Sequence, residues 1–397
     1  MDYTTSRRCK LSDQPKRAPS IAPVLLDNVL DIELIQPELR RRSCQQKQRI
    51  DEMCKTKRWL WNKFSRGMNP WEKIPSLIQE QKISRAYYKM WEILAEFRIL
   101  DDYTDCSQPI SFLHLCEGPG GFIQACREYR QKLYKDEESV HKDTHVGITL
   151  KPNEQDTNLP DFSQDVGNIT NCKVIYGQDG TGDLYNTKNI KGLPESLAEA
   201  SPLGNKAQII TADGGFDVSD DFDNQETLSA KLFLCQVLSA LECQAKDGHF
   251  VMKIFDMHTR VMMDILYMLR INYRLMYIYK PAMSRPCNSE YYVVCLLFKD
   301  EVVKSHITKL YTMLNKINKL PPNYVINSLF SKPPPIPFMN EIALFNNDIS
   351  HTQFANIDLV INTINQGKNT SNAILERHKE TQMNIAREYC KIYKLIM

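Results

Sequence analysis

The stretch Leu115-Cys116-Glu117-Gly118-Pro119-Gly120-Gly121-Phe122 joins an apolar run to an amphipathic one. The run before it predicts a β-strand, and residues 121–132 repeat apolar positions at the helical period. Glycines at such a junction allow a tight turn and let a ligand approach the backbone, while the helix start offers free N–H groups. Taken alone, the stretch fits an ordinary strand–helix turn equally well, and it lacks the glycine spacing of the dinucleotide motif.

The alternation of strand and helix continues along the chain. Candidate strands cover Ile110–Cys116, His145–Leu150, Lys173–Tyr176, Ala207–Ala212, His249–Ile254, Leu275–Tyr279 and Tyr291–Phe298, and candidate helices cover Gly121–Lys132, Asn224–Cys243 and Thr259–Arg270. This order predicts an α/β fold with a mostly parallel central sheet and helices on both faces. The last two strands follow each other without a helix, which predicts an antiparallel edge pair. Ligands of such sheets bind beyond the carboxyl ends of the strands, where the glycine-rich stretch lies.

Composition restricts the class of protein. The 397 residues are 42% hydrophobic and 25% charged, which is typical of a globular chain, and the net charge is only +2. Any basic surface must therefore come from an uneven distribution of charge. The longest apolar runs fall short of the ~20 residues that cross a bilayer, and residues 1–20 lack a secretory signal, so we expect an intracellular protein without a membrane partner. Twelve cysteines without a Cys-x-x-Cys pair predict reduced thiols and no metal.

The chain divides into three parts. Residues 1–75 form a basic N-terminal extension, with residues 1–20 expected to be disordered, residues 76–300 hold the alternating domain, and residues 301–397 form a helical C-terminal extension. A helix is expected over residues 78–98, others over 301–317 and 372–396, and Pro333–Pro337 is expected to be an extended connector or an SH3-type ligand. Basic residues from Arg40 to Arg66 mix with Trp59 and Trp61, which fits either RNA contact or a solvated helix with a tryptophan anchor.

Polar residues stand at the ends of three further apolar runs. Asp213 follows residues 207–212, Lys253 lies within residues 249–254, and the polar segment 280–290 precedes the strand from Tyr291. A buried lysine is costly unless its pKa falls or a carboxylate lies near it. Each group alone fits an ordinary structural charge, but their joint occurrence in one alternating domain predicts a site.

These motifs, in this order, resemble those of FtsJ-type ribose 2′-O-methyltransferases, and most closely the eukaryotic and viral branch that methylates the first transcribed nucleotide of capped mRNA. The matching segments are Asn69-Pro70-Trp71-Glu72, Arg85-Ala86-Tyr87-Tyr88-Lys89-Met90, Cys116–Phe122, Gly147-Ile148-Thr149-Leu150-Lys151, Asp179–Asp183, Asp213-Gly214-Gly215-Phe216 and Ser284-Arg285-Pro286-Cys287-Asn288-Ser289-Glu290. The resemblance runs from about Asn69 to Lys299. It implies a Rossmann-like S-adenosylmethionine-dependent methyltransferase fold.

The resemblance also implies a catalytic tetrad of Lys89, Asp213, Lys253 and Glu290. A ribose hydroxyl is a poor nucleophile at neutral pH, and an amine can take its proton only when neutral, so the pKa of the base must fall from ~10.4 to about 7–8. We expect Lys253 to be the base and Lys89 the neighbouring cation that steers the hydroxyl. The carboxylates would orient the two lysines.

The implied cofactor is S-adenosylmethionine. The resemblance places Cys116, Glu117, Gly118, Pro119, Gly120, Gly121 and Phe122 at its methionine part, Asp183 and Leu184 near its adenosine, and Asp213 beside it. No metal is implied, because the sulfonium is already an activated leaving group. The expected RNA contacts are Lys63, Arg66, Asp223, Asn224, Gln225, Arg285 and Asn288. Asp223 departs from the asparagine of the human-type enzymes, which leaves open a contact with the positively charged methylated guanine.

Capped mRNA, meaning the 7-methylguanosine cap and the first nucleotides, is the implied partner, with capping or transcription machinery as a further partner of either extension. One alternative is methylation of the second cap nucleotide or of an internal ribose of rRNA or tRNA. Another is an inactive methyltransferase fold that serves as an RNA-binding subunit. The basic stretches Arg40–Arg42 and Lys55–Arg58 favour the nucleus, although a cytoplasmic viral enzyme would look the same.

Overall fold

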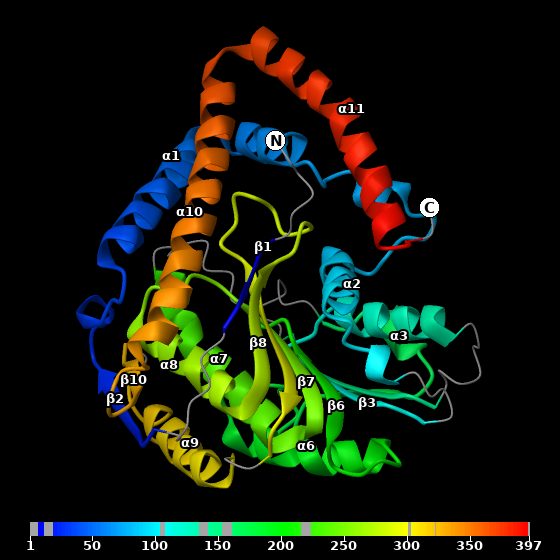
Figure 1. Cartoon of the computed structure of the whole chain (residues 1–397), viewed down its shortest axis with the longest axis vertical. Helices are drawn as coiled ribbons and strands as arrows, with labels where there is room; N and C mark the ends of the chain where they lie inside the picture. Colours follow the sequence, from blue (N-terminus) through cyan, green and yellow to red (C-terminus); the bar gives the residue numbers. More distant parts are fainter. Residues whose placement is uncertain are drawn as a thin grey trace.

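An eight-stranded sheet forms the centre of the computed structural model, which describes residues 7–11, 19–103, 108–134, 142–152, 161–215, 224–300, 303–321 and 323–395 (Figure 1). Its strands are β1 (Arg7–Lys10), β3 (Ser111–Leu115), β4 (Thr144–Ile148), β5 (Cys172–Ile175), β6 (Ala207–Ala212), β7 (Gln244–Ile254), β8 (Tyr273–Lys280) and β9 (Tyr291–Phe298). Their spatial order is β1-β8-β9-β7-β6-β3-β4-β5. Strands β3 to β7 are parallel, as the alternation of strands and helices predicts.

Helices cover both faces of the sheet, because the side chains of each inner strand alternate between two apolar cores. Leu113 and Leu115 of β3 pack with α6 (Thr187–Ala200), α7 (Gln225–Cys243) and α8 (Arg260–Asn272). Phe112, which directly precedes Leu113, packs on the other face with α2 (Arg85–Phe97) and α3 (Gly121–Tyr134). The predicted α/β architecture with helices on both faces is therefore confirmed.

The antiparallel pair predicted for the last two strands is also confirmed, since β8 pairs antiparallel with β9. The outermost strand on this side of the sheet was not predicted: it is β1, which pairs antiparallel with β8. The expectation of disorder is thus wrong for Arg7–Lys10. This short polar strand has no apolar pattern of its own and is fixed by backbone pairing with an edge that only the folded domain supplies.

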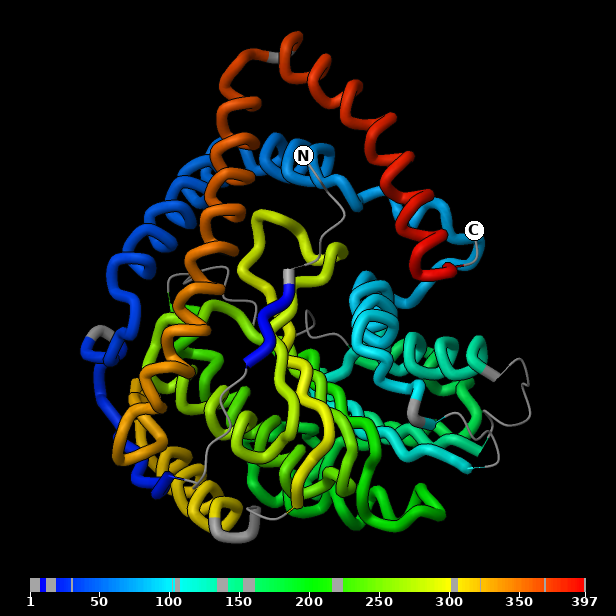
Figure 2. The backbone as a smooth tube through the Cα atoms, in the orientation of Figure 1, coloured from blue at the N-terminus to red at the C-terminus, as the bar shows by residue number. Residues whose placement is uncertain are grey.

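The N-terminal and C-terminal extensions pack against each other. Strand β2 (Ile21–Leu26) pairs antiparallel with β10 (Val325–Phe330), next to α9 (Val303–Ile317). Helix α1 (Pro37–Gly67) bends where Lys57 leaves helical geometry, with φ −136° and ψ 35°. Helices α10 (Ile336–Asn365) and α11 (Lys368–Ile392) follow, and Figure 2 shows that α1, α10 and α11 form an arch above the β8–β9 connection.

Two predicted boundaries move for identifiable reasons. Only Pro333–Pro335 is extended, because α10 begins at Ile336 and takes Pro337 into its first turn, where the missing N–H is not needed. The helix expected over residues 78–98 begins at Arg85, because the Ser84 hydroxyl accepts a hydrogen bond from the Ala86 N–H and caps the helix there.

The arch ends on the alternating domain of residues 76–300. A small apolar cluster of Phe64, Met68, Val360, Ile364 and Leu375 joins α1 to α10 and α11. At the end of α11 the indole N–H of Trp91 in α2 donates to the Tyr393 carbonyl oxygen at 3.0 Å. Among the described residues, no helix combines the length and the apolar character that a membrane span requires.

Candidate active site

The loops after β3, β4 and β5 meet at one edge of the sheet. The Gly118 N–H donates to the Thr149 hydroxyl at 3.3 Å, and the Lys151 N–H donates to the Thr181 carbonyl at 2.8 Å. Gly182 has φ +72°, and a Cβ there would lie 1.7 Å from the Thr149 carbonyl oxygen, so only glycine allows the two loops to pack this closely. The structure thus brings the glycine-rich loop and the Asp179–Asp183 loop together.

Two buried side chains, Glu117 and Phe122, hold the glycine-rich loop in place. Glu117 is buried, and its Oε1 accepts a hydrogen bond from the Phe122 N–H at 2.6 Å at the start of α3. Burial, reinforced by the Asp213 charge, raises the pKa of Glu117 well above its usual range. Phe122 is fully buried, with its ring centroid 6.0 Å from that of Tyr292. Burial also raises the pKa of Cys116 to about 12, so this residue remains a thiol.

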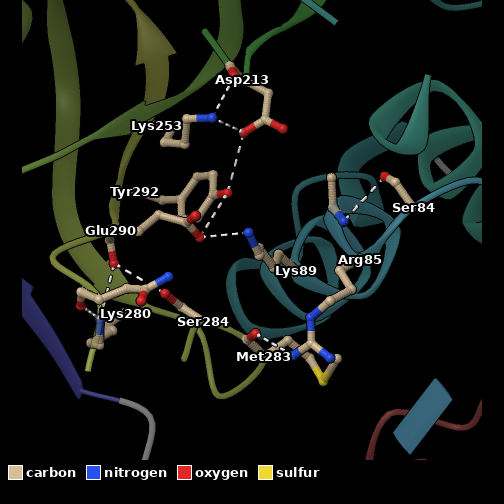
Figure 3. A network of polar contacts seen from close by, with 12 residues as sticks. Ser84, Arg85, Lys89, Asp213, Lys253, Lys280, Met283, Ser284, Glu290 and Tyr292 are labelled. Atoms are coloured by element: carbon tan, nitrogen blue, oxygen red, sulfur yellow. Dashed lines mark hydrogen bonds and ion pairs between the residues drawn. The ribbon is translucent and has the colours of Figure 1, made fainter. Parts of the chain in front are cut away.

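The four residues of the expected tetrad converge as two ion pairs (Figure 3). Lys89 Nζ of α2 lies 2.7 Å from Glu290 Oε1, which immediately precedes β9. Lys253 Nζ of β7 lies 3.1 Å from Asp213 Oδ1, directly after β6, and donates to the Asp213 carbonyl oxygen at 2.6 Å. All four side chains are largely buried, with exposed fractions between 14% and 18%.

Tyr292 joins the two ion pairs, and it was not among the site residues predicted from the sequence. Its hydroxyl lies 3.3 Å from Asp213 Oδ1 and 3.3 Å from Glu290 Oε1, so it can donate to either carboxylate. Burial and the two carboxylates raise its pKa well above the usual value, which keeps the hydroxyl a donor. A signal existed in the sequence, because a residue two positions after Glu290 in a strand points to the same face. Tyr292 is also the cross-strand partner of Lys253.

Charges inside the cluster set its protonation. Burial alone would raise the pKa of Glu290, but Lys89 and Lys253 outweigh it and lower the pKa to about 2. Burial alone would lower the pKa of Lys253, but the carboxylates of Asp213 and Glu290 raise it above the usual value. The prediction that the pKa of Lys253 is lowered is therefore wrong for the protein without its cofactor. The carboxylates of Asp213 and Glu290 outweigh desolvation.

Lys280, which lies next to the tetrad, has a lowered pKa. Burial lowers the pKa of Lys280 to about 8, against the opposing charge of Glu290. Its Nζ donates to the carbonyl oxygens of Asn288 and Glu290 at 2.7 and 3.1 Å. Lys280 thus holds the backbone of the segment that carries Glu290.

The loop residues provide acceptors and space that suit an adenosyl sulfonium cofactor. The Tyr185 N–H donates to Asp183 Oδ1 at 2.8 Å, and no donor among the described residues contacts the other oxygen of that carboxylate, which suits a ribose hydroxyl. A Cβ on Gly215 would lie 3.3 Å from Lys253 Nζ, so a side chain there would take up space next to this amine. Leu184 is buried beside Asp183.

A cavity of about 250 Å³ opens beside Glu290. It is lined by Lys47, Ile50, Asp51, Trp61, Gln225, Phe255, Cys287, Asn288, Ser289, Glu290 and Gln353. The structure therefore brings two of the expected RNA contacts, Gln225 and Asn288, to the tetrad. Asn224, next to Gln225, accepts a hydrogen bond from Arg40 Nη2 at 3.4 Å.

Three of the remaining expected RNA contacts, Arg285, Lys63 and Arg66, are described by the structure. Arg285 Nε is 3.9 Å from Glu72 Oε2, and Arg85 Nη1 is 3.3 Å from the same oxygen. Lys63 Nζ donates to Asn372 Oδ1 at 2.8 Å, and Arg66 is exposed at the end of α1. Asp223 and Phe216 lie outside the described residues.

Several residues that line the cavity could not be identified as site residues from the sequence. Trp61 and Lys47 belong to the basic and aromatic stretch 40–66, but its pattern does not say which side chains face the domain. Lys47 Nζ forms a buried ion pair with Asp256 Oδ2 at 2.6 Å, which fixes α1 to the carboxyl end of β7. Gln353 lies on α10 and has no signal in the sequence. In the part of the chain that is described, no group of three or more His, Cys, Asp or Glu side chains is arranged to hold a metal ion.

Comparison with known proteins fits this geometry. Residues 83–298 match the FtsJ-like methyltransferase family. A cap-specific mRNA (nucleoside-2′-O-)-methyltransferase 2 of Mus musculus is 31% identical over 246 residues, or 60% of this chain and 31% of that protein. A cap-specific mRNA (nucleoside-2′-O-)-methyltransferase 1 of Dictyostelium discoideum is 31% identical over 278 residues, or 65% and 36%. An inactive cap-specific methyltransferase 1B of Caenorhabditis briggsae is 31% identical over 254 residues, or 61% and 28%.

The family match covers the alternating domain and its site. This chain spans about a third of the length of the curated relatives that it matches. The matched residues run from the start of α2 to the end of β9 and include Lys89, Asp213, Lys253 and Glu290. The match also confirms the expectation of S-adenosylmethionine as the cofactor of this methyltransferase domain. The chain belongs to the FtsJ-like methyltransferase family.

Proposed function

We propose that this chain transfers the methyl group of S-adenosylmethionine to the ribose 2′-hydroxyl of the first transcribed nucleotide of capped mRNA. The observation that carries this proposal is the convergence of two lysine–carboxylate pairs, joined by Tyr292, at the sheet edge where the glycine-rich loop lies. Curated relatives at about 31% identity are cap-specific 2′-O-methyltransferases by name, which supports this substrate class.

Lys253 acts as the base in this proposal. A neutral amine accepts the 2′-hydroxyl proton while the oxygen takes the methyl group, and the cofactor leaves as a neutral thioether. The carboxylates of Asp213 and Glu290 raise the pKa of Lys253 in the protein alone. Because a like charge lowers the pKa of a lysine, the sulfonium of the bound cofactor favours the neutral amine. Tyr292 and Lys89 hold the carboxylates so that neither moves to trap the proton on Lys253.

The cavity beside Glu290 suits the cap. A methylated guanine is aromatic and positively charged, so an indole and a carboxylate are complementary to it. Trp61 supplies the indole and Asp51 the carboxylate, one from each of two successive parts of α1. Gln225 and Asn288 add groups that can hydrogen-bond to a base edge. The triphosphate bridge would then pass toward Arg285, with the target ribose at the tetrad.

The outer face of α1 suits the rest of the RNA. Lys55, Lys57, Arg58, Lys63 and Arg66 are all exposed, and none of them forms an ion pair with an acid among the described residues. Trp59 stands among them with 65% of its surface exposed. Phosphate contacts from basic side chains, with an aromatic ring for base stacking, are typical of single-stranded RNA binding.

Experiment must decide between this proposal and two alternatives, methylation of the second cap nucleotide and an inactive RNA-binding subunit. Relatives numbered 1 and 2 share the same identity with this chain, so their names do not choose between the first and the second cap nucleotide. A relative named inactive has that identity too, which means that identity alone does not choose between an enzyme and an RNA-binding subunit. The presence of all four tetrad residues in two close pairs favours an enzyme.

The test is methyl transfer from labelled S-adenosylmethionine to a short RNA with a 7-methylguanosine cap, compared with the same RNA carrying a 5′-triphosphate. We expect labelling of the capped RNA only, and no labelling when its first nucleotide is already 2′-O-methylated. Labelling of the premethylated RNA would move the target to the second nucleotide. Equal labelling of capped and uncapped RNA would remove the cap from the proposal, and tight RNA binding without labelling would favour the binding subunit.

A further inference from the structure

Glu92 is a buried carboxylate at the junction of three elements. It lies on α2, three residues after Lys89 and so on the same side of the helix, and it is fully buried. The Tyr279 hydroxyl at the end of β8 donates to Glu92 Oε1 at 2.7 Å, and the Ala282 N–H donates to the same oxygen at 2.7 Å. The other oxygen, Oε2, lies 3.4 Å from the Met283 N–H.

The loop that Glu92 contacts carries a tetrad residue. Residues 281–290 connect β8 to β9 and end at Glu290. Arg85 Nη2 donates to the Met283 carbonyl at 3.2 Å, and the Ser284 hydroxyl donates to the Glu290 carbonyl at 3.3 Å (Figure 3). A shift of Ala282 and Met283 would therefore be passed along this short loop to the partner of Lys89.

The fourth donor to Glu92 comes from outside the family match. The Tyr389 hydroxyl of α11 donates to Glu92 Oε2 at 2.8 Å, and Tyr389 is 4% exposed. Figure 1 shows α11 descending from the top of the arch to α2. Loss of the Tyr389 hydroxyl would take the shorter of these hydrogen bonds from Oε2 and leave it the longer one from the Met283 N–H, which is costly for an oxygen buried away from water.

We infer that Glu92 is a positioning residue for methyl transfer and that the C-terminal helix α11 acts on the active site through the hydroxyl of Tyr389. The inference rests on the proposed function. When all four donors contact Glu92, this residue fixes the position of Lys89 through their common helix. It also fixes the position of Glu290 through the 281–290 loop. The C-terminal extension is then part of the working site although it contributes no group to the reacting atoms.

The chain offers a matched control for this inference. The hydroxyl of Tyr393, four residues after Tyr389, also donates to an acid of α2, at 2.6 Å from Glu96 Oε1. Among the described residues, Glu96 forms no hydrogen bond or ion pair with the 281–290 loop, whereas Glu92 accepts two hydrogen bonds from it. Tyr389→Phe and Tyr393→Phe each remove one hydroxyl at the end of α11 and keep the ring. Comparing the two variants therefore distinguishes the effect of the hydrogen bond to Glu92 from a general loosening of α11.

The experiment measures hydrogen exchange of the 281–290 amides and methyl transfer to capped RNA in the full chain. For Tyr389→Phe we expect faster exchange at Ala282 and Met283 and a kcat about tenfold lower, with an unchanged KM for S-adenosylmethionine, since a buried acceptor loses its donor. Tyr393→Phe should match the wild type in both readouts. Glu92→Gln, which keeps the shape of the side chain, should speed exchange of the same amides.

Each outcome bears on the inference. Exchange in Tyr389→Phe as slow as in Tyr393→Phe would overturn the link between α11 and the loop. Faster exchange with a wild-type kcat would overturn the positioning role. If the wild type labels no RNA, the proposed function fails, while the exchange comparison still decides whether α11 controls the loop. If Tyr389→Phe fails to fold, the exchange of Glu92→Gln decides in its place, and slow exchange there would overturn the inference.

Discussion

The tetrad and the outer face of α1 organise their charges in opposite ways. In the tetrad, two lysines and two acids are largely buried and paired at 2.7 and 3.1 Å. On α1, Lys55, Lys57 and Arg58 are exposed, and no acid among the described residues pairs with them. Buried paired charges keep a fixed geometry, whereas exposed basic charges attract phosphates without fixing a distance. We therefore expect changes in the tetrad to act on kcat and changes on α1 to act on the KM for RNA.

The largest expected effect comes from removing the proposed base. Lys253→Met should lower methyl transfer by a factor of about 10²–10⁴, the usual contribution of general base catalysis. S-adenosylmethionine affinity, measured by calorimetry, should change little, because among the described residues no hydrogen bond or ion pair joins Lys253 to the glycine-rich loop. Lys246→Met removes an exposed lysine from the other end of β7 and should keep the wild-type rate. Substantial turnover by Lys253→Met would refute the assignment.

The next largest effect tests the bridge between the two pairs. Tyr292→Phe removes a hydroxyl shared by Asp213 and Glu290 and should lower kcat by about 10- to 100-fold, because a hydrogen bond to a charged group is worth about 1.5–3 kcal/mol. Tyr273→Phe removes a buried hydroxyl that donates to Gln244 at 2.9 Å, away from the tetrad. That control should lose stability but not rate. A Tyr292→Phe enzyme with a wild-type kcat would show that the pairs work independently.

The cavity is lined both by Glu290 of the tetrad and by Trp61 of α1, and replacing Trp61 should change RNA binding without changing kcat. Trp61→Ala should raise the KM for capped RNA by about tenfold at constant kcat, since stacking on an aromatic ring contributes about 1–3 kcal/mol per base. Trp59→Ala is the matched control, because Trp59 is exposed and does not line the cavity. With a cap dinucleotide as substrate, the control should behave as the wild type. An equal effect of both changes would place the cap elsewhere.

A smaller effect is expected on the exposed face of α1. The triple variant Lys55→Gln, Arg58→Gln and Lys63→Gln should weaken binding of a capped RNA of about 20 nucleotides and reduce the slope of log affinity against log salt by about 2, at ~0.7 per phosphate contact on a single strand. The charge-matched control Lys309→Gln, Lys316→Gln and Lys319→Gln lies on and just after α9, at the far end of the molecule in Figure 1. If both variants reduce the slope equally, α1 is not the RNA surface.

The smallest expected effect is the titration of the buried cluster. The folded pKa of Glu290 is lowered from 4.5 to about 2, so its contribution to stability is present above pH 4.5 and is lost as the pH falls toward 2. Chemical unfolding of the wild type and of Glu290→Gln at pH 7 and pH 3 should show a stability difference that shrinks by about 1–3 kcal/mol at the lower pH. A difference that is independent of pH would mean that the Lys89 pair does not hold this carboxylate ionised.

The sequence predicts the inner sheet well and the extensions poorly. Strands β6 and β9 match their predicted bounds, because strands buried on both faces are continuously apolar. Strands β1, β2 and β10 went unpredicted, since each is fixed by a partner far away in the chain. Helix α10 was missed in the same way, because the prolines before it suggested an extended connector and its packing depends on α1.

The candidate site shows the same limit. The family resemblance names Lys89, Asp213, Lys253 and Glu290, and the fold brings them together because the last three stand at the ends of strands β6, β7 and β9 and Lys89 of α2 pairs with Glu290. Tyr292 reads as a core residue of an apolar strand until its neighbour across the sheet is known. Contacts from the extensions, such as Gln353 in the cavity and Tyr389 on Glu92, depend on packing between segments about 65 and 300 residues apart.

The most direct test of the central claim is the chemical position of the transferred methyl group. After reaction of the wild type with labelled S-adenosylmethionine and capped RNA, the product is digested to nucleosides and separated by mass. The account predicts a 2′-O-methylribose on the first transcribed nucleotide, and none in a parallel reaction with Lys253→Met. A labelled base, a labelled cap guanine, or the same ribose label from the Lys253 variant would contradict it.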